Sequence, residues 1–166
     1  MNYMDDASTF ERSLLQKARQ KHIPVTGALE LLPLCNMNCD MCYVRLSRSE
    51  MERQGRLRTV EEWVRLAEQM QKAGTVFLLL TGGEPLLQPD AADFLRKVRE
   101  LGFAVKLDTN GCDPARLAEI LTEKSRAYGH NIFLVSDEPY RDIAFDGRAV
   151  PYPAAFYPHT LTCFSF

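Results

Sequence analysis

Three cysteines near the start of the chain have the residue type and spacing best suited to chemistry. Cys35, Cys39 and Cys42 lie within eight residues in the pattern C-x3-C-x2-C. Such short gaps let one loop place three thiolates around a single metal centre. A structural zinc normally has four protein ligands, no second cysteine pair follows, and the three histidines are remote in sequence. Three thiolates on a [4Fe–4S] cluster leave one iron open. The pattern favours such a cluster over zinc or unligated cysteines.

The cysteine count and the N-terminal segment indicate the cellular compartment. The chain has five cysteines, an odd number, and the acidic, polar segment Met1–Phe10 does not resemble a signal peptide. A disulfide framework is therefore disfavoured, and we expect a reducing, cytoplasmic environment. Cys112 and Cys163 stand alone, and we expect them to be small buried hydrophobic residues.

Two further motifs each follow an apolar run. Gly-Gly-Glu-Pro at residues 82–85 comes after Val76–Leu80, and Asp-Thr-Asn-Gly at residues 108–111 comes after Phe103–Leu107. Glycine permits positive φ and close backbone approach, so both motifs are also compatible with ordinary turns. Their chemistry depends on what lies beside them.

The elements that would position these motifs alternate between strand and helix. A capping box of Thr59 and Glu62 opens a helix that Gly74 closes. Apolar strands joined through helices predict right-handed βαβ units, an α/β fold and a parallel sheet, with the motifs at the carboxyl ends of its strands. The expected strands are Ala28–Leu34, Val76–Leu80, Phe103–Leu107 and Ile132–Val135, with a short final strand at Thr160–Phe164. The other expected helices are Thr9–Arg19 (ended by Pro24), one from Pro89 to Gly102, and one from Asp113 to Ala127.

Composition excludes several function classes. The 166 residues contain 20 Lys and Arg against 22 Asp and Glu, which gives a net charge of −2. No basic excess points to nucleic acid or to an anionic membrane surface. The apolar runs are far shorter than the ~20 residues that cross a bilayer. We therefore expect neither a nucleic-acid partner nor a membrane partner.

The cysteine pattern resembles that of the radical S-adenosylmethionine (radical SAM) superfamily, which carries it after the first barrel strand. The resemblance implies that Cys35, Cys39 and Cys42 each bind one iron of a [4Fe–4S] cluster. It also implies that S-adenosylmethionine (SAM) binds the fourth iron. An electron donor such as a flavodoxin or ferredoxin would allow reductive cleavage to a 5′-deoxyadenosyl radical, which abstracts hydrogen from a substrate. Met41 stands where the family often has an aromatic residue, and Met41 and Tyr43 are expected to shield the cluster.

The same resemblance assigns roles to the two later motifs. Gly82, Gly83 and Glu84 match the family's Gly-Gly-Glu motif, which binds the SAM amino group, so Glu84 would offset the ammonium charge. Asp108 or Asn110 is expected to contact cofactor or substrate, and Asn110 is the choice for SAM. The segment 21–121 looks most like the sulfatase-maturase-like branch, which weakly implies a peptide substrate; a small-molecule substrate stays open, and the catalytic residues stay unknown.

The segment 117–166 resembles a fragment of a fold-type I aminotransferase dependent on pyridoxal phosphate (PLP). Asp137 would match the residue that pairs with the pyridine nitrogen, and Tyr140 the residue that binds the phenolic oxygen. No lysine follows Lys124, so no internal aldimine is expected and these contacts would be vestigial.

Together the resemblances predict a composite chain. An N-terminal helix (1–20) would precede a radical SAM core (21–121) and an aminotransferase-like fragment (122–166). The expected fold is a truncated partial (β/α) barrel with about four parallel strands and an irregular C-terminal tail. Three functions stay open at this point: a SAM-cleaving enzyme, a non-catalytic cluster- and SAM-binding module whose chemistry is lost through truncation, and a zinc-binding fragment.

Overall fold

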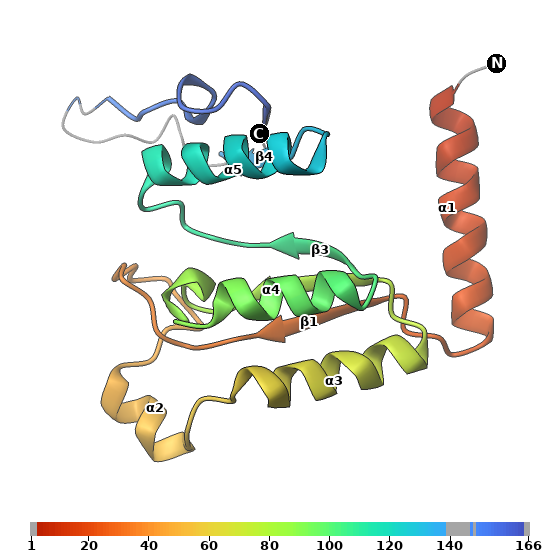
Figure 1. Ribbon diagram of the computed structural model, residues 1–166, viewed down its shortest axis with the longest axis horizontal. Coiled ribbons are helices and arrows are strands. Elements are labelled where there is room, and N and C mark those ends of the chain that lie inside the picture. Colours follow the sequence, from red (N-terminus) through yellow and green to blue (C-terminus); the bar gives the residue numbers. More distant parts are fainter. Residues whose placement is uncertain (1–2, 139–146, 148, 165–166) are drawn as a thin grey trace. The chain divides into compact units, whose positions relative to one another are not determined.

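The structure is a computed structural model that describes residues 3–138, 147 and 149–164 (Figure 1). The side chains of residues 3–8 and 116 lie outside this description. The chain divides into two compact units, Met1–Asn110 and Gly111–Phe166, and each is described by itself. No helix of the described part is both long and apolar enough to cross a bilayer.

The first unit begins with helix α1, Tyr3–Gln20, which is longer than the predicted Thr9–Arg19. The helix ends at Gln20, ahead of Pro24. His22 adopts the left-handed region with φ 54°, and the N–H of Ile23 donates to the carbonyl of Ala18 at 2.9 Å. This hydrogen bond satisfies a carbonyl that the helix end would leave open.

Three parallel strands form the sheet of the first unit. They are β1 (Thr26–Glu30), β2 (Phe77–Thr81) and β3 (Ala104–Leu107), in the order β1-β2-β3. The register pairs Leu29 with Leu80 and Leu80 with Leu107. The parallel strands are confirmed, although β1 is shorter than the predicted Ala28–Leu34. Beyond Glu30 the chain bonds to the turn after β2, where the N–H of Gly83 donates to the carbonyl of Leu32 at 2.8 Å.

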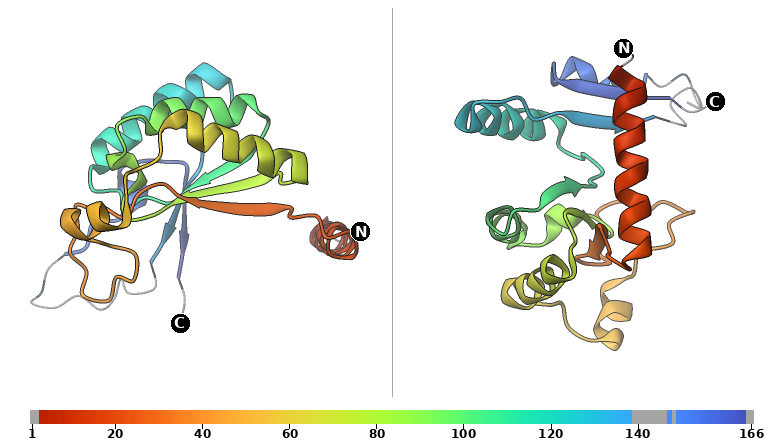
Figure 2. Two further views of the ribbon diagram at one scale, coloured as in Figure 1. Left: turned by 90° about the horizontal axis from the view of Figure 1, so that it is seen from below. Right: turned by 90° about the vertical axis from the view of Figure 1, so that its right-hand side faces the viewer.

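Helices α3 (Val60–Ala73) and α4 (Ala91–Glu100) cover one face of this sheet, as both views in Figure 2 show. The predicted capping box of Thr59 and Glu62 is formed, and Gly74 ends α3 in the left-handed conformation with φ 103°. The core between helices and sheet consists of buried apolar side chains, among them Leu29, Trp63, Ala67, Leu78, Leu80, Phe94 and Val98. Shorter helices are α2 (Arg48–Gln54) and the 3-10 turn η1 (Pro85–Leu87).

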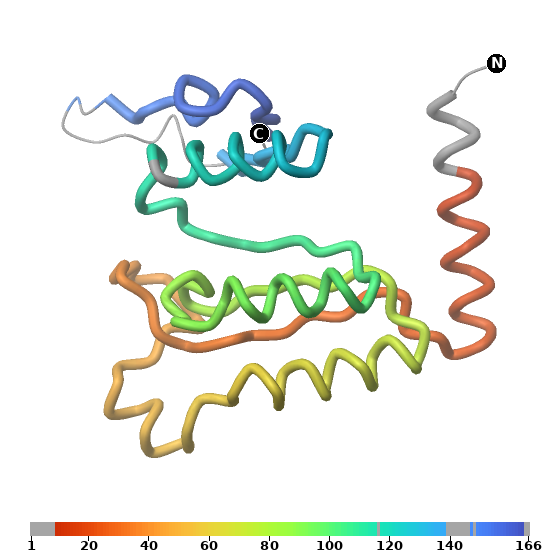
Figure 3. Tube along the Cα trace, in the orientation of Figure 1, coloured from red at the N-terminus to blue at the C-terminus, as the bar shows by residue number. Residues whose placement is uncertain are grey.

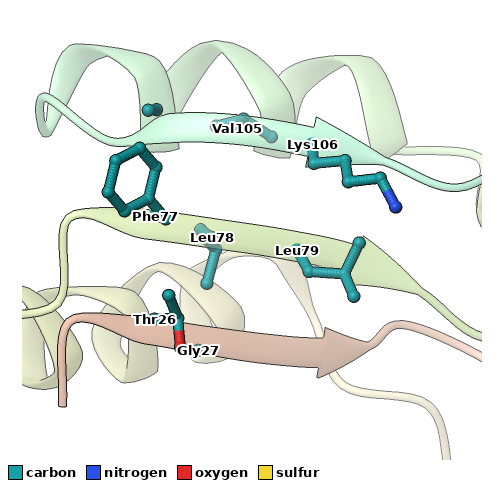
Figure 4. Close-up of a pocket in the computed structure, with 8 residues that line it drawn as sticks. Thr26, Gly27, Phe77, Leu78, Leu79, Val105 and Lys106 are labelled. Atoms are coloured by element: carbon teal, nitrogen blue, oxygen red, sulfur yellow. The ribbon is translucent and has the colours of Figure 1, made fainter. Parts of the chain in front are cut away.

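The other face of the sheet carries a shallow apolar pocket of about 340 Å³ (Figure 4). Phe77, Leu79 and Lys106 lie on this face, away from α3 and α4. The alternation along β2 explains the difference between the faces: Leu78 and Leu80 are buried under the helices, whereas Phe77 is half exposed. Successive side chains of a strand point to opposite faces of the sheet.

The second unit contains helix α5 (Pro114–Tyr128), strands β4 (Leu134–Asp137) and β5 (Thr160–Cys163), and the 3-10 turn η2 (Pro153–Ala155). β4 and β5 pair in parallel in a separate two-stranded sheet. The α/β class is confirmed, but the prediction of a single sheet with a fourth parallel strand is wrong for the described residues. The buried hydroxyl of Tyr157 donates to the carbonyl of Ile132 at 2.6 Å, which anchors the chain before β5 beside the chain before β4.

Candidate functional site

The three cysteines of the pattern lie on the cysteine loop, residues 31–47, which joins β1 to α2 and can be followed in Figure 3. Cys35 is half-buried, whereas Cys39 and Cys42 are exposed, and all are free thiols. The N–H of Cys42 donates to the carbonyl of Cys39 at 3.1 Å, so the chain turns between these two cysteines. Among the residues that the structure describes, no three His, Cys, Asp or Glu side chains form a group that could hold a metal ion. The thiols thus share one loop without converging.

Backbone N–H groups nevertheless point at two of the sulfur atoms. The N–H of Met37 donates to Sγ of Cys35 at 3.4 Å, and the N–H of Arg45 donates to Sγ of Cys42 at 3.4 Å. Hydrogen bonds from the N–H groups of Val44 and Arg45, with a smaller contribution from the Arg45 charge, lower the pKa of Cys42. A lowered pKa favours the thiolate, which is the form of cysteine that binds metals.

The Gly-Gly-Glu turn, Gly82–Pro85, follows β2 and lies directly against the start of the cysteine loop. The N–H of Glu84 donates to the carbonyl of Leu34 at 2.9 Å. A Cβ at Gly82 would collide with the carbonyl of Leu32, and Gly82 has φ 137°. Only a residue without a side chain allows this approach in this conformation. The two glycines therefore fix the cysteine loop to the end of β2.

Glu84 is almost completely buried, at 2% exposure. Its Oε1 accepts hydrogen bonds from the N–H of Leu86 and from the hydroxyl of Thr109, each at 3.0 Å. Its Oε2 accepts from the same hydroxyl at 3.0 Å and from the N–H of Asn110 at 2.7 Å. The carboxylate thus joins the turn after β2 to the turn after β3. The sequence did not predict that Glu84 connects the two turns, nor that Thr109 takes part. The only signal for Thr109 was that it is a polar residue following the next strand.

Asn110 extends this network to the cysteine loop. Its side-chain amide Nδ2 donates to Oδ1 of Asn36 at 2.8 Å and to Sγ of Cys35 at 3.6 Å. The carboxyl ends of β1, β2 and β3 are therefore connected through side chains, as expected for neighbouring parallel strands. Cys35, Glu84 and Asn110, all predicted from the sequence, lie together in one hydrogen-bonded network.

Other predicted residues lie apart from this network or differ from expectation. The carboxylate of Asp108 pairs with Lys106 at 2.9 Å, and both side chains are well exposed. Asp137 is the exposed last residue of β4 in the second unit, and Tyr140 falls outside the described residues. The expectation that Cys112 and Cys163 are buried is wrong, because both are exposed.

The chemistry of the cysteine loop fits an iron–sulfur cluster. The donors are three free thiols, the ligand type that holds such clusters, and N–H groups already aim at the sulfurs of Cys35 and Cys42. The expected shielding is not formed: Met41 is 81% exposed and Tyr43 is 95% exposed. Neither side chain therefore covers the cysteine loop.

Comparison with known proteins identifies the family. A sequence model of the radical SAM superfamily matches residues 29–149. A probable GTP 3′,8-cyclase of Pyrococcus abyssi (strain GE5 / Orsay) is 35% identical over 101 residues, which is 60% of this chain and 32% of that protein. The chain thus spans about a third of the length of this relative. The family match includes the cysteine loop and both later turns, and it extends past residue 121, where the resemblance was expected to end. Because this match covers more than half of its residues, the chain belongs to the radical SAM superfamily.

Proposed function

We propose that the chain binds a [4Fe–4S] cluster through Cys35, Cys39 and Cys42. SAM would bind beside Gly82, Gly83, Glu84 and Asn110. The observation that carries this proposal is the network from Glu84 through Asn110 to Cys35, which connects the proposed SAM residues to a proposed iron ligand. Bound together, the two cofactors supply reductive cleavage of SAM to a 5′-deoxyadenosyl radical for hydrogen abstraction.

The residues of this chain would prepare both binding sites. An N–H group is directed at the sulfur of Cys35 and another at the sulfur of Cys42, and the pKa of Cys42 is lowered by such hydrogen bonds. The described contacts of the Glu84 carboxylate come from neutral donors, so its negative charge is not cancelled by a cation. A buried carboxylate of this kind favours the ammonium group of SAM nearby.

The substrate is a proposal of its own. The 101 residues shared with a probable GTP 3′,8-cyclase make GTP the first substrate to test. A peptide is the second, because the segment 21–121 resembles the sulfatase-maturase-like branch. An electron donor such as a flavodoxin or ferredoxin and a cytoplasmic location remain predictions, as does the absence of nucleic-acid and membrane partners.

Anaerobic reconstitution tests the proposal. Iron and sulfide should bind in the amounts of one [4Fe–4S] cluster, and reduction with SAM present should release 5′-deoxyadenosine. Cys39→Ala should lose the cluster. Cys112→Ala is the matched control, because Cys112 is also an exposed cysteine but lies outside the loop. A single zinc without sulfide in the wild type, or unchanged iron in Cys39→Ala, contradicts the proposal. A complete cluster with SAM bound but uncleaved supports the non-catalytic binding module instead.

For the segment 117–166 the aminotransferase resemblance remains a prediction. The radical SAM match runs through residue 149 and so includes Asp137 and Tyr140. Titration with PLP distinguishes an aminotransferase origin of this segment from a radical SAM origin. A retained cofactor contact would change the PLP absorbance, and Asp137→Ala would abolish that change. No spectral response in the wild type would contradict the vestigial PLP contacts.

A further inference from the structure

The side-chain amide of Asn110 reaches a cysteine of another loop. We propose that Asn110 is a positioning residue for Cys35, donating an N–H to its sulfur, and that Glu84 holds Asn110 in place. This assignment rests on the proposed ligation of a cluster by the cysteine loop. It gives Asn110 a task at the iron ligand in addition to the SAM contact predicted from the sequence.

The turn that carries Asn110 is held in place by Glu84, which lies in the turn after β2. The N–H of Asn110 donates to Oε2 of Glu84 at 2.7 Å, and the hydroxyl of Thr109 lies 3.0 Å from both oxygens of the same carboxylate. Glu84 is 2% exposed, so water competes little for these hydrogen bonds. A charge-assisted contact to a buried carboxylate orients the following side chain more firmly than a contact between two exposed neutral groups.

The amide of Asn110 then spans two groups on the cysteine loop. It donates to Oδ1 of Asn36 at 2.8 Å and to Sγ of Cys35 at 3.6 Å. Among the described residues, Cys35 is the one cysteine of the pattern that receives a donor from outside its own loop. At Cys42 the donor is the N–H of Arg45, three residues further along the same loop. Cys35 is therefore the ligand whose position depends on β3.

A hydrogen bond to a ligating sulfur has a known consequence. It stabilises the more negative, reduced state of an iron–sulfur cluster, so it raises the reduction potential. Groups that orient and hydrogen-bond metal ligands in this way commonly affect affinity as well. Loss of the Asn110 donor should therefore lower the potential of the cluster before SAM is present.

The test compares anaerobically reconstituted wild type, Asn110→Leu and Asn38→Leu by potentiometric titration without SAM. Asn110→Leu keeps the size of the side chain but removes its N–H donor. Asn38→Leu is the matched control, since it removes an amide from the cysteine loop itself. We expect about tenfold less reduced cluster in Asn110→Leu at a fixed potential, which is a shift of about 59 mV for one electron. The control should titrate like the wild type.

The outcomes separate this inference from the proposed function. An unchanged potential in Asn110→Leu with full iron and sulfide overturns the inference, even if SAM affinity falls, and leaves cluster binding intact. Failure of the wild type to bind iron and sulfide overturns the proposed function itself. If Asn110→Leu does not load a cluster, Asn110→Ala decides by the same titration. Thr109→Val, which removes the hydroxyl that contacts both carboxylate oxygens of Glu84, should shift the potential in the same direction by less.

Discussion

The cysteine loop and the Gly-Gly-Glu turn lie side by side but are built differently. The loop exposes Cys39 and Cys42. The turn buries Glu84 and connects its backbone and carboxylate to the chains after β1 and β3. Ligands that a metal gathers can stay open until it binds, because metal binding and local ordering are coupled. The turn has no such help and must be held by the protein alone.

The largest expected effect comes from Gly82→Ala, which places a methyl group in the Gly-Gly-Glu turn. Gly82 and Gly55 have almost the same φ, 137° and 136°, but a Cβ at Gly82 meets the carbonyl of Leu32, whereas nothing lies within 4 Å at Gly55. We expect Gly82→Ala to cost about 3–5 kcal/mol in unfolding free energy, from strain plus collision. Gly55→Ala should cost about 1–2 kcal/mol from strain alone.

Urea unfolding followed by tryptophan fluorescence measures this difference. The chain has a single tryptophan, Trp63, which is buried in the core of the first unit. Its signal therefore reports on the unit that contains both glycines. Equal losses in the two variants would show that the turn is not packed against Leu32.

Removal of the buried carboxylate should have the next largest effect. Glu84→Ala removes the buried carboxylate that accepts hydrogen bonds from the N–H of Leu86, the hydroxyl of Thr109 and the N–H of Asn110. A hydrogen bond to a charged group contributes about 1.5–3 kcal/mol, so we expect a loss of about 3 kcal/mol by the same urea measurement. Glu50→Ala is the matched control, because Glu50 also accepts hydrogen bonds from Ser47 but is exposed. A loss in Glu50→Ala as large as in Glu84→Ala would contradict the argument from burial.

The same contrast explains which features the sequence could predict. The capping box of Thr59 and Glu62 and the end of α3 at Gly74 depend on residues a few positions apart, and both were predicted correctly. The buried role of Glu84 depends on Thr109, 25 positions away, so no local pattern contains it. The pairing of β4 is equally non-local. An apolar strand indicates that it needs a partner but not which one, and here the partner is β5 rather than the first sheet.

A smaller effect is expected from acid, which should weaken the contact between the segment after α2 and the start of α3. This contact is the ion pair of Arg56 and Glu62. The Arg56 guanidinium, followed by the N–H of Thr59, lowers the pKa of Glu62 from 4.5 to about 2. A lowered folded-state pKa adds stability that is complete above pH 4.5 and is lost as the pH falls toward about 2. Arg56→Met should reduce the loss of stability between these pH values, measured by urea unfolding across the range. A pH profile identical to the wild type would contradict the pairing.

The smallest effect on the apo protein is expected at the cysteine loop itself. Cys39 is exposed, so Cys39→Ala removes almost no packing and should change the unfolding free energy by less than about 0.5 kcal/mol. After anaerobic reconstitution the two proteins should separate, because a ligand that binds only the folded state stabilises the wild type. The difference would then measure what the cluster contributes to the loop. A large loss already in apo Cys39→Ala would mean that the loop is packed before any metal arrives, and the contrast with the Gly-Gly-Glu turn would disappear.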